Sequence, residues 1–349
     1  MKTEELNYEL PPELVAQQPS DIRSKSRLLV LRRGSALIDA YFERIGEFFR
    51  PGDCLVLNDT KVVPARFFAR RASGAKIEGL FIREAAMGEW ESLLKNAGRL
   101  KTGETFSLLD HNRQVFCSMQ AQDAGTEGMW RLKVNHSADA YRILEAVGIM
   151  PLPPYIKRKD AGQEIVSADR ERYQTVYARH AGAVAVPTAG LHFTDALIEQ
   201  LKQQGIKFAH LTLHVGIGTF KPVTADTLEE HQIHSETYRL DEHNAAIIND
   251  AKASGGRVIA VGTTSVRTLE TIAQGGKVAA QSGSTQLFIK PGYQFKIVEG
   301  MVTNFHLPRS TLLALVGAFA GLENIMASYR HAVEQRYRFY SYGDAMLIV

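Results

Sequence analysis

Two histidines, each close to a glycine, are the residues of this sequence whose type and setting best suit catalysis. His192 lies in the run AVAVPTAGLHFT, and His214 lies in the run TLHVGIGTF. A neutral imidazole takes up a proton near neutral pH, and glycines such as Gly216 and Gly218 let a ligand approach the backbone closely. We therefore expect His192 and His214 to be catalytic and the two glycines to contact a ligand.

Predicted strands must position these histidines. Residues 184–186 are short and apolar, which is typical of a strand covered on both faces, and Pro187 would end its hydrogen-bond ladder. Thr194 is a favourable N-cap for a helix over 195–203. Ligands of open α/β sheets lie at the carboxyl ends of the strands, so we expect both histidines in the floor of one active site.

A further strand end, after residues 258–261, carries hydroxyl groups. Thr263, Thr264 and Ser265 stand at the start of a predicted helix, and Arg267 follows one turn later. Helix N-termini and arginine side chains both bind anions, so these four residues suit a carboxylate or ribose hydroxyls. An ordinary helix cap, the alternative, would need only one of the three hydroxyls.

Other polar residues stand at or near the ends of predicted strands. Asn304 and His306 lie in MVTNFH, and Asp344 precedes the last predicted strand. Asn58 closes the strand of DCLVLN, where a simple turn is the alternative explanation. Glu236, in the run HSE, could relay protons or orient a histidine. The sequence thus gathers many reactive side chains at strand ends.

The middle of the chain has a different pattern. Residues 66 to 134 contain short stretches of β-rich or alternating pattern, separated by glycine-containing turns, which predict a small antiparallel barrel. The expected fold is therefore α/β: a mixed-sheet core domain, residues 1–65 and 150–349, with an inserted β-barrel domain at 66–149. Arg66 and nearby cations could face RNA, although a solvated basic surface is the simpler explanation for each of them.

A stiff basic arm follows the predicted barrel. The run GIMPLPPYIKRK holds the chain extended through its prolines and presents Tyr155 beside Lys157 and Arg158. An aromatic ring with cations could stack a base and lie along an RNA backbone, while a plain interdomain linker explains the run equally well. Residues 160–172 are polar and predict an exposed loop.

Composition sets limits on the function. The chain has 349 residues and a net charge of +3, which permits an RNA partner without demanding one. Cys54 and Cys117 are the only cysteines and form no metal-type pair. The first residues are acidic and lack an apolar signal core, and the apolar run at 312–320 is too short to cross a bilayer. We expect a soluble, cytoplasmic protein without a membrane partner.

The familiar short motifs are missing from the sequence. It contains no G-x-G-x-x-G after a strand, no P-loop and no G-x-S-x-G elbow. His231 and His234, together with the other histidines, could hold a metal in an enzyme acting on a nucleotide or sugar, but no H-E-x-x-H pattern supports this and we expect no metal. A non-catalytic RNA-binding protein is the other alternative, although it leaves the polar strand ends unexplained.

Several longer motifs together indicate a resemblance to a known family. They are LNDTKVVPAR at 57–66, GIMPLPPYIKR at 148–158, AVAVPTAGLHFT at 183–194, LHVGIGTFKPV at 213–223, VIAVGTTSVRTLE at 258–270, MVTNFHLPRSTLL at 301–313 and YRFYSYGDAMLI at 337–348. In register over essentially the whole chain, the sequence resembles the S-adenosylmethionine:tRNA ribosyltransferase-isomerases of queuosine biosynthesis. Val186 and Ile217 stand where the family pattern usually has alanine, which questions the shape of the pocket rather than its chemistry.

The resemblance implies the reaction. The ribosyl group of S-adenosylmethionine is transferred to 7-aminomethyl-7-deazaguanine at the wobble position of a tRNA with a GUN anticodon, and it is isomerised to give epoxyqueuosine-tRNA. Adenine and methionine leave, so S-adenosylmethionine is a cosubstrate and no prosthetic group or metal is expected. The resemblance also implies an α/β core with an inserted β-barrel, and we expect a monomer.

The resemblance lets roles be assigned to the candidate residues. A base must remove a proton from the ribose carbon beside the sulfonium, and we expect His192 or His214 to do so, with Glu236 assisting and His306 as the next candidate. The residues expected to bind S-adenosylmethionine are Gly216, Gly218, Thr263, Thr264, Ser265 and Arg267. Those expected to bind the tRNA substrate are Asn58, Arg66, Tyr155, Lys157, Arg158, Asn304, His306 and Asp344.

Overall fold

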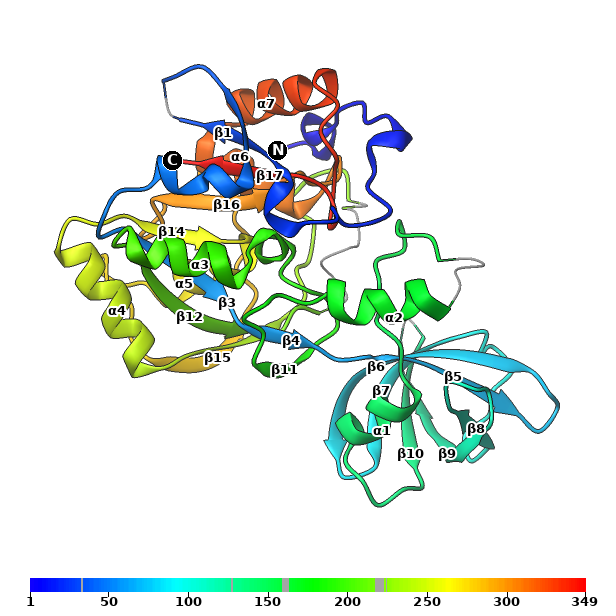
Figure 1. The fold of residues 1–349 in the computed structure, drawn as a ribbon. Helices are drawn as coiled ribbons and strands as arrows, with labels where there is room; N and C mark the ends of the chain where they lie inside the picture. Colours follow the sequence, from blue (N-terminus) through cyan, green and yellow to red (C-terminus); the bar gives the residue numbers. More distant parts are fainter. Residues whose placement is uncertain (33, 127, 159–162, 217–222, 224) are drawn as a thin grey trace.

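A large α/β body with a smaller β-barrel at its side makes up the molecule (Figure 1). The computed structural model describes residues 1–349 apart from 33, 127, 159–162, 217–222 and 224, and apart from the side chains of 163–166. Gly218 therefore lies outside the described residues, as does most of the GIGTF run. The expected fold class, a mixed-sheet α/β core with an antiparallel barrel, is confirmed.

The main sheet has nine strands in the described residues, in the order β15-β13-β12-β3-β14-β16-β17-β1-β2. Their bounds are β1 Arg27–Leu31, β2 Ile38–Tyr41, β3 Cys54–Asn58, β12 Lys207–Leu213, β13 Glu236–Leu240, β14 Val258–Val261, β15 Gln281–Thr285, β16 Gly300–Asn304 and β17 Ala345–Ile348. Strands β12, β3, β14 and β16 run parallel to one another, and β17 is antiparallel to β16. The carboxyl ends of β3, β12, β14 and β16 therefore meet at one edge of the sheet, where the start of β17 lies too.

Helices cover both faces of this sheet (Figure 1). They are α3 (Asp195–Gln203), α4 (Glu242–Ala253), α5 (Thr263–Ile272), α6 (Thr311–Ala320) and α7 (Leu322–Glu334). Alternate residues of β3 enter different cores: Val56 packs with residues of α5 and α6, whereas Leu55 and Leu57 pack with residues of α3. This explains why the central strands are apolar on both sides. No single helix in the described residues is long and apolar enough to span a membrane, although the bent pair α6 and α7 meets that test together, at 114°.

The barrel is closed by six antiparallel strands. They are β5 (Arg66–Arg71), β6 (Lys76–Ala86), β7 (Glu89–Lys95), β8 (Thr105–Leu109), β9 (Val115–Ala124) and β10 (Met129–Val134), and helix α1 (Ala140–Val147) follows. Phe67 and Trp90 fill the interior with their rings 5.8 Å apart. A β-carbon at Gly79 would come within 2.1 Å of the Phe67 ring, so this glycine makes room for it. The division at residues 66 and 149 stays a prediction.

Two predicted segments differ from the structure. Residues 184–186 are not a strand: the strand ends earlier, as β11 (His180–Ala183), which pairs with β4 (Thr60–Val62) in a small separate sheet. The reason is packing, because the Val184 side chain enters the barrel core while its N–H donates to the carbonyl of Val215. Residues 160–172 were expected as a loop, but 163–172 form helix α2 (Gln163–Arg172). Polar residues such as Gln, Glu and Arg favour helices.

The predictions for two helices agree with the structure. Helix α3 has the predicted bounds, and the Thr194 side chain accepts a hydrogen bond from the N–H of Leu197, as expected of an N-cap. The apolar run at 312–320 lies within α6, whose side chains are mostly buried. Both results follow from local sequence signals, which do not depend on distant contacts.

Candidate active site

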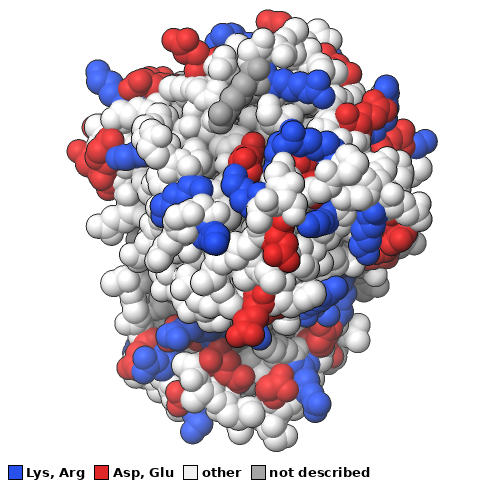
Figure 2. All heavy atoms as spheres, turned by 90° about the vertical axis from the view of Figure 1, so that its left-hand side faces the viewer, with Lys and Arg blue, Asp and Glu red and all other residues white. Residues whose placement is uncertain are grey.

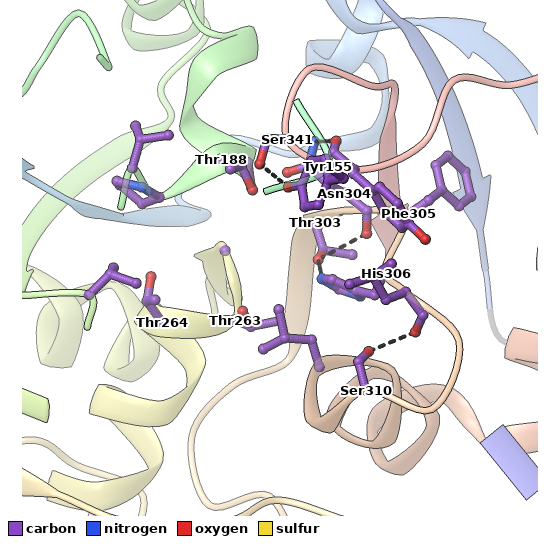
Figure 3. A pocket seen from close by; sticks show the side chains of 18 residues that line it. Tyr155, Thr188, Thr263, Thr264, Thr303, Asn304, Phe305, His306, Ser310 and Ser341 are labelled. Atoms are coloured by element: carbon purple, nitrogen blue, oxygen red, sulfur yellow. Dashed lines mark hydrogen bonds between the residues drawn. The ribbon is translucent and has the colours of Figure 1, made fainter. Parts of the chain in front are cut away.

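A cavity of about 670 Å³ opens at the carboxyl ends of β14 and β16. Its walls come from six parts of the chain: Tyr155, the segment 186–189, Val215, the start of α5, the end of β16 with the turn into α6, and Tyr340 with Ser341 before β17. Figure 3 shows Thr263 and Thr264 entering from α5 and Asn304 with His306 entering from the end of β16. The edge of the sheet at which the parallel strands end is therefore the edge that carries the cavity, as the sequence predicted.

The three hydroxyl residues at the start of α5 have two different roles. Gly262 has a positive φ of 89°, which turns the chain sharply from β14 into the helix. Thr263 and Thr264 then line the cavity. Ser265 lies buried and donates its hydroxyl hydrogen to the carbonyl of Val261, which ties the helix to the strand. Two of the three predicted hydroxyl residues thus face the cavity, and the third supports the turn.

Asn58 lies behind this cluster and joins three elements. Its amide nitrogen donates to the carbonyl of Leu213, at 3.0 Å, and to the hydroxyl of Thr264, at 3.2 Å. Its side-chain oxygen accepts from the N–H of Leu213 at 3.0 Å. The side chain is fully buried and does not line the cavity. Asn58 therefore fixes the position of Thr264, where the sequence predicted direct contact with substrate.

Asn304 is the amide that faces the cavity. Its nitrogen Nδ2 lies 3.1 Å from Nε2 of His192 and near the carbonyl oxygens of Tyr340 and Asp344, at 3.4 and 3.5 Å. The two carbonyl oxygens can only accept, which identifies this atom as the amide nitrogen. The other atom, Oδ1, is buried and has no hydrogen-bond partner among the described residues. A buried acceptor without a partner is costly, so this oxygen is suited to bind a ligand donor.

His192 supports Asn304 from behind. Its Nε2 accepts the amide hydrogen, and its Nδ1 then carries the proton and lies 2.7 Å from the hydroxyl oxygen of Ser26. Burial, together with the charges of Arg23 and Arg338, lowers the pKa of His192 to about 3, so the ring is neutral at physiological pH. His192 does not line the cavity.

His214 lies elsewhere. Its Nδ1 is 2.8 Å from the hydroxyl oxygen of Thr60, and the ring packs against Gly182, where a β-carbon would come within 2.8 Å of it. Burial and the charge of His180 lower the pKa of His214. The expectation that His192 and His214 share the floor of one cavity is therefore not met, because the ring of His214 packs under the small sheet of β4 and β11.

His306, in contrast, lines the cavity beside Asn304. Its Nε2 lies 3.2 Å from the hydroxyl oxygen of Thr303, and its Nδ1 lies 3.3 Å from that of Tyr329. A hydroxyl group can donate or accept, so either ring nitrogen can carry the proton. Burial lowers the pKa of His306 to about 3, which keeps the ring neutral.

Glu236 and Arg267 form a buried ion pair next to this cavity. A guanidinium nitrogen of Arg267 contacts the Glu236 carboxylate, whose other oxygen accepts from the N–H of Gly216 at 3.0 Å. Both side chains line a second hollow, which has Leu312 in common with the first cavity. Glu236 was expected among the catalytic residues, and the structure places it against an arginine rather than a histidine.

The basic arm reaches the cavity through its aromatic residue. Tyr155 lies in the wall, with its hydroxyl 2.5 Å from that of Ser341 and its ring 4.8 Å from the ring of Tyr340. Lys157 is exposed. Arg158 makes two hydrogen bonds to the Asp169 carboxylate, at 2.7 and 2.9 Å, with only 13% of its side chain exposed. Of the two predicted RNA-binding cations, one is therefore already neutralised.

Two other predicted substrate residues lie away from the cavity walls. The carboxylate of Asp344 accepts hydrogen bonds from the backbone N–H groups of Arg27 and Arg338, both at 2.8 Å. Burial raises the pKa of Asp344. Arg66 pairs with Glu78 at 2.8 Å on the barrel. Each of these side chains thus already has a structural partner.

Several wall residues were not predicted from the sequence. They are Thr188, Thr303, Ser310, Tyr340 and Ser341. Thr188, Thr303 and Ser310 lie at or next to a strand end or a helix start, a position that could have indicated them, whereas Tyr340 and Ser341 lie in the turn before β17. Small hydroxyl residues occur in many such turns, so their type alone does not distinguish them.

The distribution of surface charge and of side chains that could bind a metal also bears on the function. Figure 2 shows Lys and Arg interspersed with Asp and Glu over one face of the molecule, without a large area of one sign. Among the residues that the structure describes, no three His, Cys, Asp or Glu side chains gather in a way that could hold a metal ion.

The fold is a two-part α/β architecture, with a cavity at the strand ends of its main sheet and a separate β-barrel. The chain belongs to the queuosine biosynthesis protein family, whose model matches residues 3–348. Over 99% of its length it is similar to the whole chain of a solved structure, the S-adenosylmethionine tRNA ribosyltransferase of Thermotoga maritima, with 39% identity and a TM-score of 0.56. The family resemblance seen in the sequence motifs is thereby confirmed.

Proposed function

We propose that this chain transfers the ribosyl group of S-adenosylmethionine to 7-aminomethyl-7-deazaguanine in the anticodon of a GUN tRNA and isomerises it to epoxyqueuosine. The family and the similar transferase confirm the broader class, an S-adenosylmethionine-dependent tRNA ribosyltransferase of queuosine biosynthesis. Neither the metal-dependent nucleotide enzyme nor the non-catalytic RNA-binding protein is favoured by this family. We further propose that the chain acts as a cytoplasmic monomer without a prosthetic group.

The observation that carries the site assignment is the unpartnered oxygen Oδ1 of Asn304. The Asn304 side chain belongs to the wall of the cavity, which is concave as small-molecule sites are. Deazaguanine carries ring N–H and amino donors on its edge, and an oriented amide oxygen suits one of them. Tyr155 and Tyr340 lie in the same wall, where an aromatic face can stack a base or meet a sulfonium.

Thr263 and Thr264 are the proposed contacts for the ribosyl group. Both lie in the cavity wall at the N-terminus of α5, where helix N–H groups and hydroxyls can bond to ribose oxygens. Asn58 holds Thr264 in place through its amide nitrogen. This assignment leaves Arg267, one helical turn further on, outside the ribose contacts.

For removal of the ribose proton we propose His306 in preference to His192 and His214. His306 lines the cavity, whereas His192 and His214 do not belong to its wall. The sulfonium charge acidifies the neighbouring C–H bond, so a neutral imidazole is a suitable base. The lowered pKa keeps His306 in its neutral form at pH 7, although it also makes the ring a weaker base.

The test is a single incubation with three readouts. The purified enzyme is mixed with S-adenosylmethionine labelled in the ribose and with tRNA that carries 7-aminomethyl-7-deazaguanine. We expect label in the tRNA, with adenine and methionine released in equal amounts. Binding of tRNA without adenine release would instead support an RNA-binding protein, and activity that disappears with a chelator and returns with metal would support a metal-dependent enzyme.

A matched set of variants tests the proposed base. His306→Ala should lower kcat by about 10²- to 10⁴-fold and should stop exchange of the ribose C5′ hydrogens into deuterated solvent. His214→Ala is the control, because its ring lies outside the cavity. If His306→Ala exchanges at the parent rate while His214→Ala does not, the base is His214, as first expected from the sequence.

A further inference from the structure

The second hollow beside the cavity has the features of a binding site. Its volume, open solvent included, is about 570 Å³, and it is lined by residues of the segment 231–234, β13, α5, the turn at 287–289 and the start of α6. Leu312 belongs to its wall and to the wall of the first cavity, so the two spaces adjoin. Six of the eleven lining residues are apolar, His231, His234 and Thr311 are polar, and Arg267 and Glu236 supply the buried charges.

Arg267 has an unused donor in this hollow. The residue is 8% exposed, its Nε donates to the carbonyl of Leu287 at 3.2 Å, and its Nη1 contacts the Glu236 carboxylate. The remaining nitrogen, Nη2, is buried and has no hydrogen-bond partner among the described residues. A buried guanidinium N–H without an acceptor is expensive, and a carboxylate is the acceptor that arginine binds best.

Glu236 fixes the direction of that donor. Its carboxylate holds Nη1 on one side and the N–H of Gly216 on the other. The guanidinium is planar, so fixing Nη1 and Nε also fixes Nη2. Glu236 is therefore a positioning residue for Arg267, and its negative charge offsets the charge of the buried arginine.

We propose that this hollow binds the amino-acid end of S-adenosylmethionine, with the ligand carboxylate on Nη2 of Arg267 and the methylene chain against Leu287, Leu312 and Leu315. The proposal rests on the proposed function and divides the cosubstrate between two subsites. Thr263 and Arg267 are four residues apart on α5, which corresponds to about 6 Å along the helix axis. One ligand can thus reach the hydroxyls with its ribose and the arginine with its carboxylate.

The experiment removes the same interaction from the ligand and from the protein. Calorimetry in the presence of tRNA gives the affinity of S-adenosylmethionine and of its decarboxylated analogue, which keeps the amine. The proteins are the parent, Arg267→Gln and the control Arg257→Gln. Arg257 makes a comparable ion pair with Asp53, at 2.6 Å, at the start of β14 and away from both hollows.

The expected result is a loss of carboxylate dependence in one variant only. In the parent and in Arg257→Gln, the analogue should bind about 10- to 100-fold more weakly than S-adenosylmethionine, as for a hydrogen bond to a charged group. In Arg267→Gln the two ligands should differ by less than about 3-fold, because the shorter, neutral amide replaces the charged donor.

Two contrary outcomes distinguish failure of this carboxylate subsite from failure of the proposed function. If Arg267→Gln discriminates between the ligands as strongly as the parent does, the carboxylate binds elsewhere and the inference is wrong, while the proposed function stands. If the parent binds neither ligand in the presence of tRNA, the proposed function fails and the inference fails with it.

A second variant guards against misfolding of Arg267→Gln. Ile233 lines the same hollow and is partly exposed, so Ile233→Glu adds a carboxylate without opening the core. Repulsion between the two carboxylates should lower the affinity for S-adenosylmethionine by several-fold. The affinity for the decarboxylated analogue should not fall. Equal weakening of both ligands would show a steric effect only and would contradict a carboxylate at this position.

Discussion

The Nε2 atom of His192 lies 3.1 Å from the amide nitrogen of Asn304, and this contact sets the direction of the Asn304 side chain. Because the nitrogen is held by the ring, the oxygen is left without a partner among the described residues, in the wall of the cavity. A histidine that looked catalytic in the sequence is thus placed to orient a substrate-binding amide. This relationship leads to the first prediction.

His192→Ala should release Asn304 without removing a group from the cavity wall. We expect kcat/KM for the tRNA substrate to fall by about 10- to 100-fold, the size of one lost oriented hydrogen bond. Affinity for S-adenosylmethionine should stay within about 2-fold of the parent, since the contacts of Arg267 are unchanged. Steady-state kinetics and calorimetry check this.

Asn304→Asp provides the matched control. It keeps the shape but replaces the donating amide nitrogen by an accepting oxygen, so the contact survives only if Nε2 of His192 takes up the proton. If His192→Ala retains full activity on tRNA, the orienting role of the ring is wrong, whatever the result for Asn304→Asp.

The free energy of unfolding should decrease at acid pH because two buried histidines are neutral in the folded protein. The pKa values of His192 and His306 are lowered to about 3 by burial, whereas an unfolded histidine titrates near 6.5. The unfolded chain therefore binds more protons between these values, so each histidine contributes stability that is complete above about pH 6.5 and is lost as pH falls toward 3. Urea unfolding at pH 7, 6 and 5 should show decreasing midpoints.

A variant isolates one of these contributions. His306→Gln removes one titrating group, so its unfolding free energy should depend less steeply on pH between 6 and 5, by about 1.4 kcal/mol per pH unit at most. A slope equal to that of the parent would mean that His306 is already protonated in the fold, or is not buried in solution.

Lys157 of the basic arm should contribute to tRNA binding. Lys157 is exposed, so Lys157→Ala should weaken tRNA binding and reduce the slope of log affinity against log salt by about 0.7–0.9, the value for one phosphate contact. Lys252, which pairs with Glu299 at 2.8 Å, is the control for a lysine engaged elsewhere. An unchanged slope in Lys157→Ala would place the RNA contact outside this arm.

Arg158→Ala should behave differently from Lys157→Ala. Its guanidinium is bonded to the mostly buried Asp169, and removal of one partner leaves the carboxylate uncompensated. We expect a lower melting temperature and only an indirect effect on tRNA affinity. A large loss of tRNA affinity with unchanged melting temperature would restore Arg158 as a direct RNA contact.

The barrel should be sensitive at Gly79. A β-carbon there would meet the Phe67 ring at 2.1 Å, and the ring is fully buried. Gly79→Ala should therefore cost about 1–3 kcal/mol of stability, as overpacked cores do. At Gly98 a β-carbon meets nothing within 4 Å, so Gly98→Ala serves as the control in the same thermal melt. Equal melting temperatures for the two variants would contradict the packing argument.

The sequence by itself determined the elements whose signals are local. The barrel strands follow from their β-rich stretches between glycine turns, and α3 follows from the Thr194 cap and its apolar spacing. Long motifs also determined the family, because they record the identity of residues rather than their position in space. Helix α2 escaped prediction since its polar residues give no amphipathic pattern.

Only the tertiary structure decided which strand-end residues share a cavity. Asn304 and Thr264 meet there because β14 and β16 are parallel neighbours, whereas His214 is directed to Thr60 by the small sheet of β4 and β11. The partners of charged residues could not be predicted from the sequence either, since Arg267 and Glu236 are 31 positions apart. Sequence patterns report neighbours within one element, while the order of strands and long-range pairing fix what each side chain can reach.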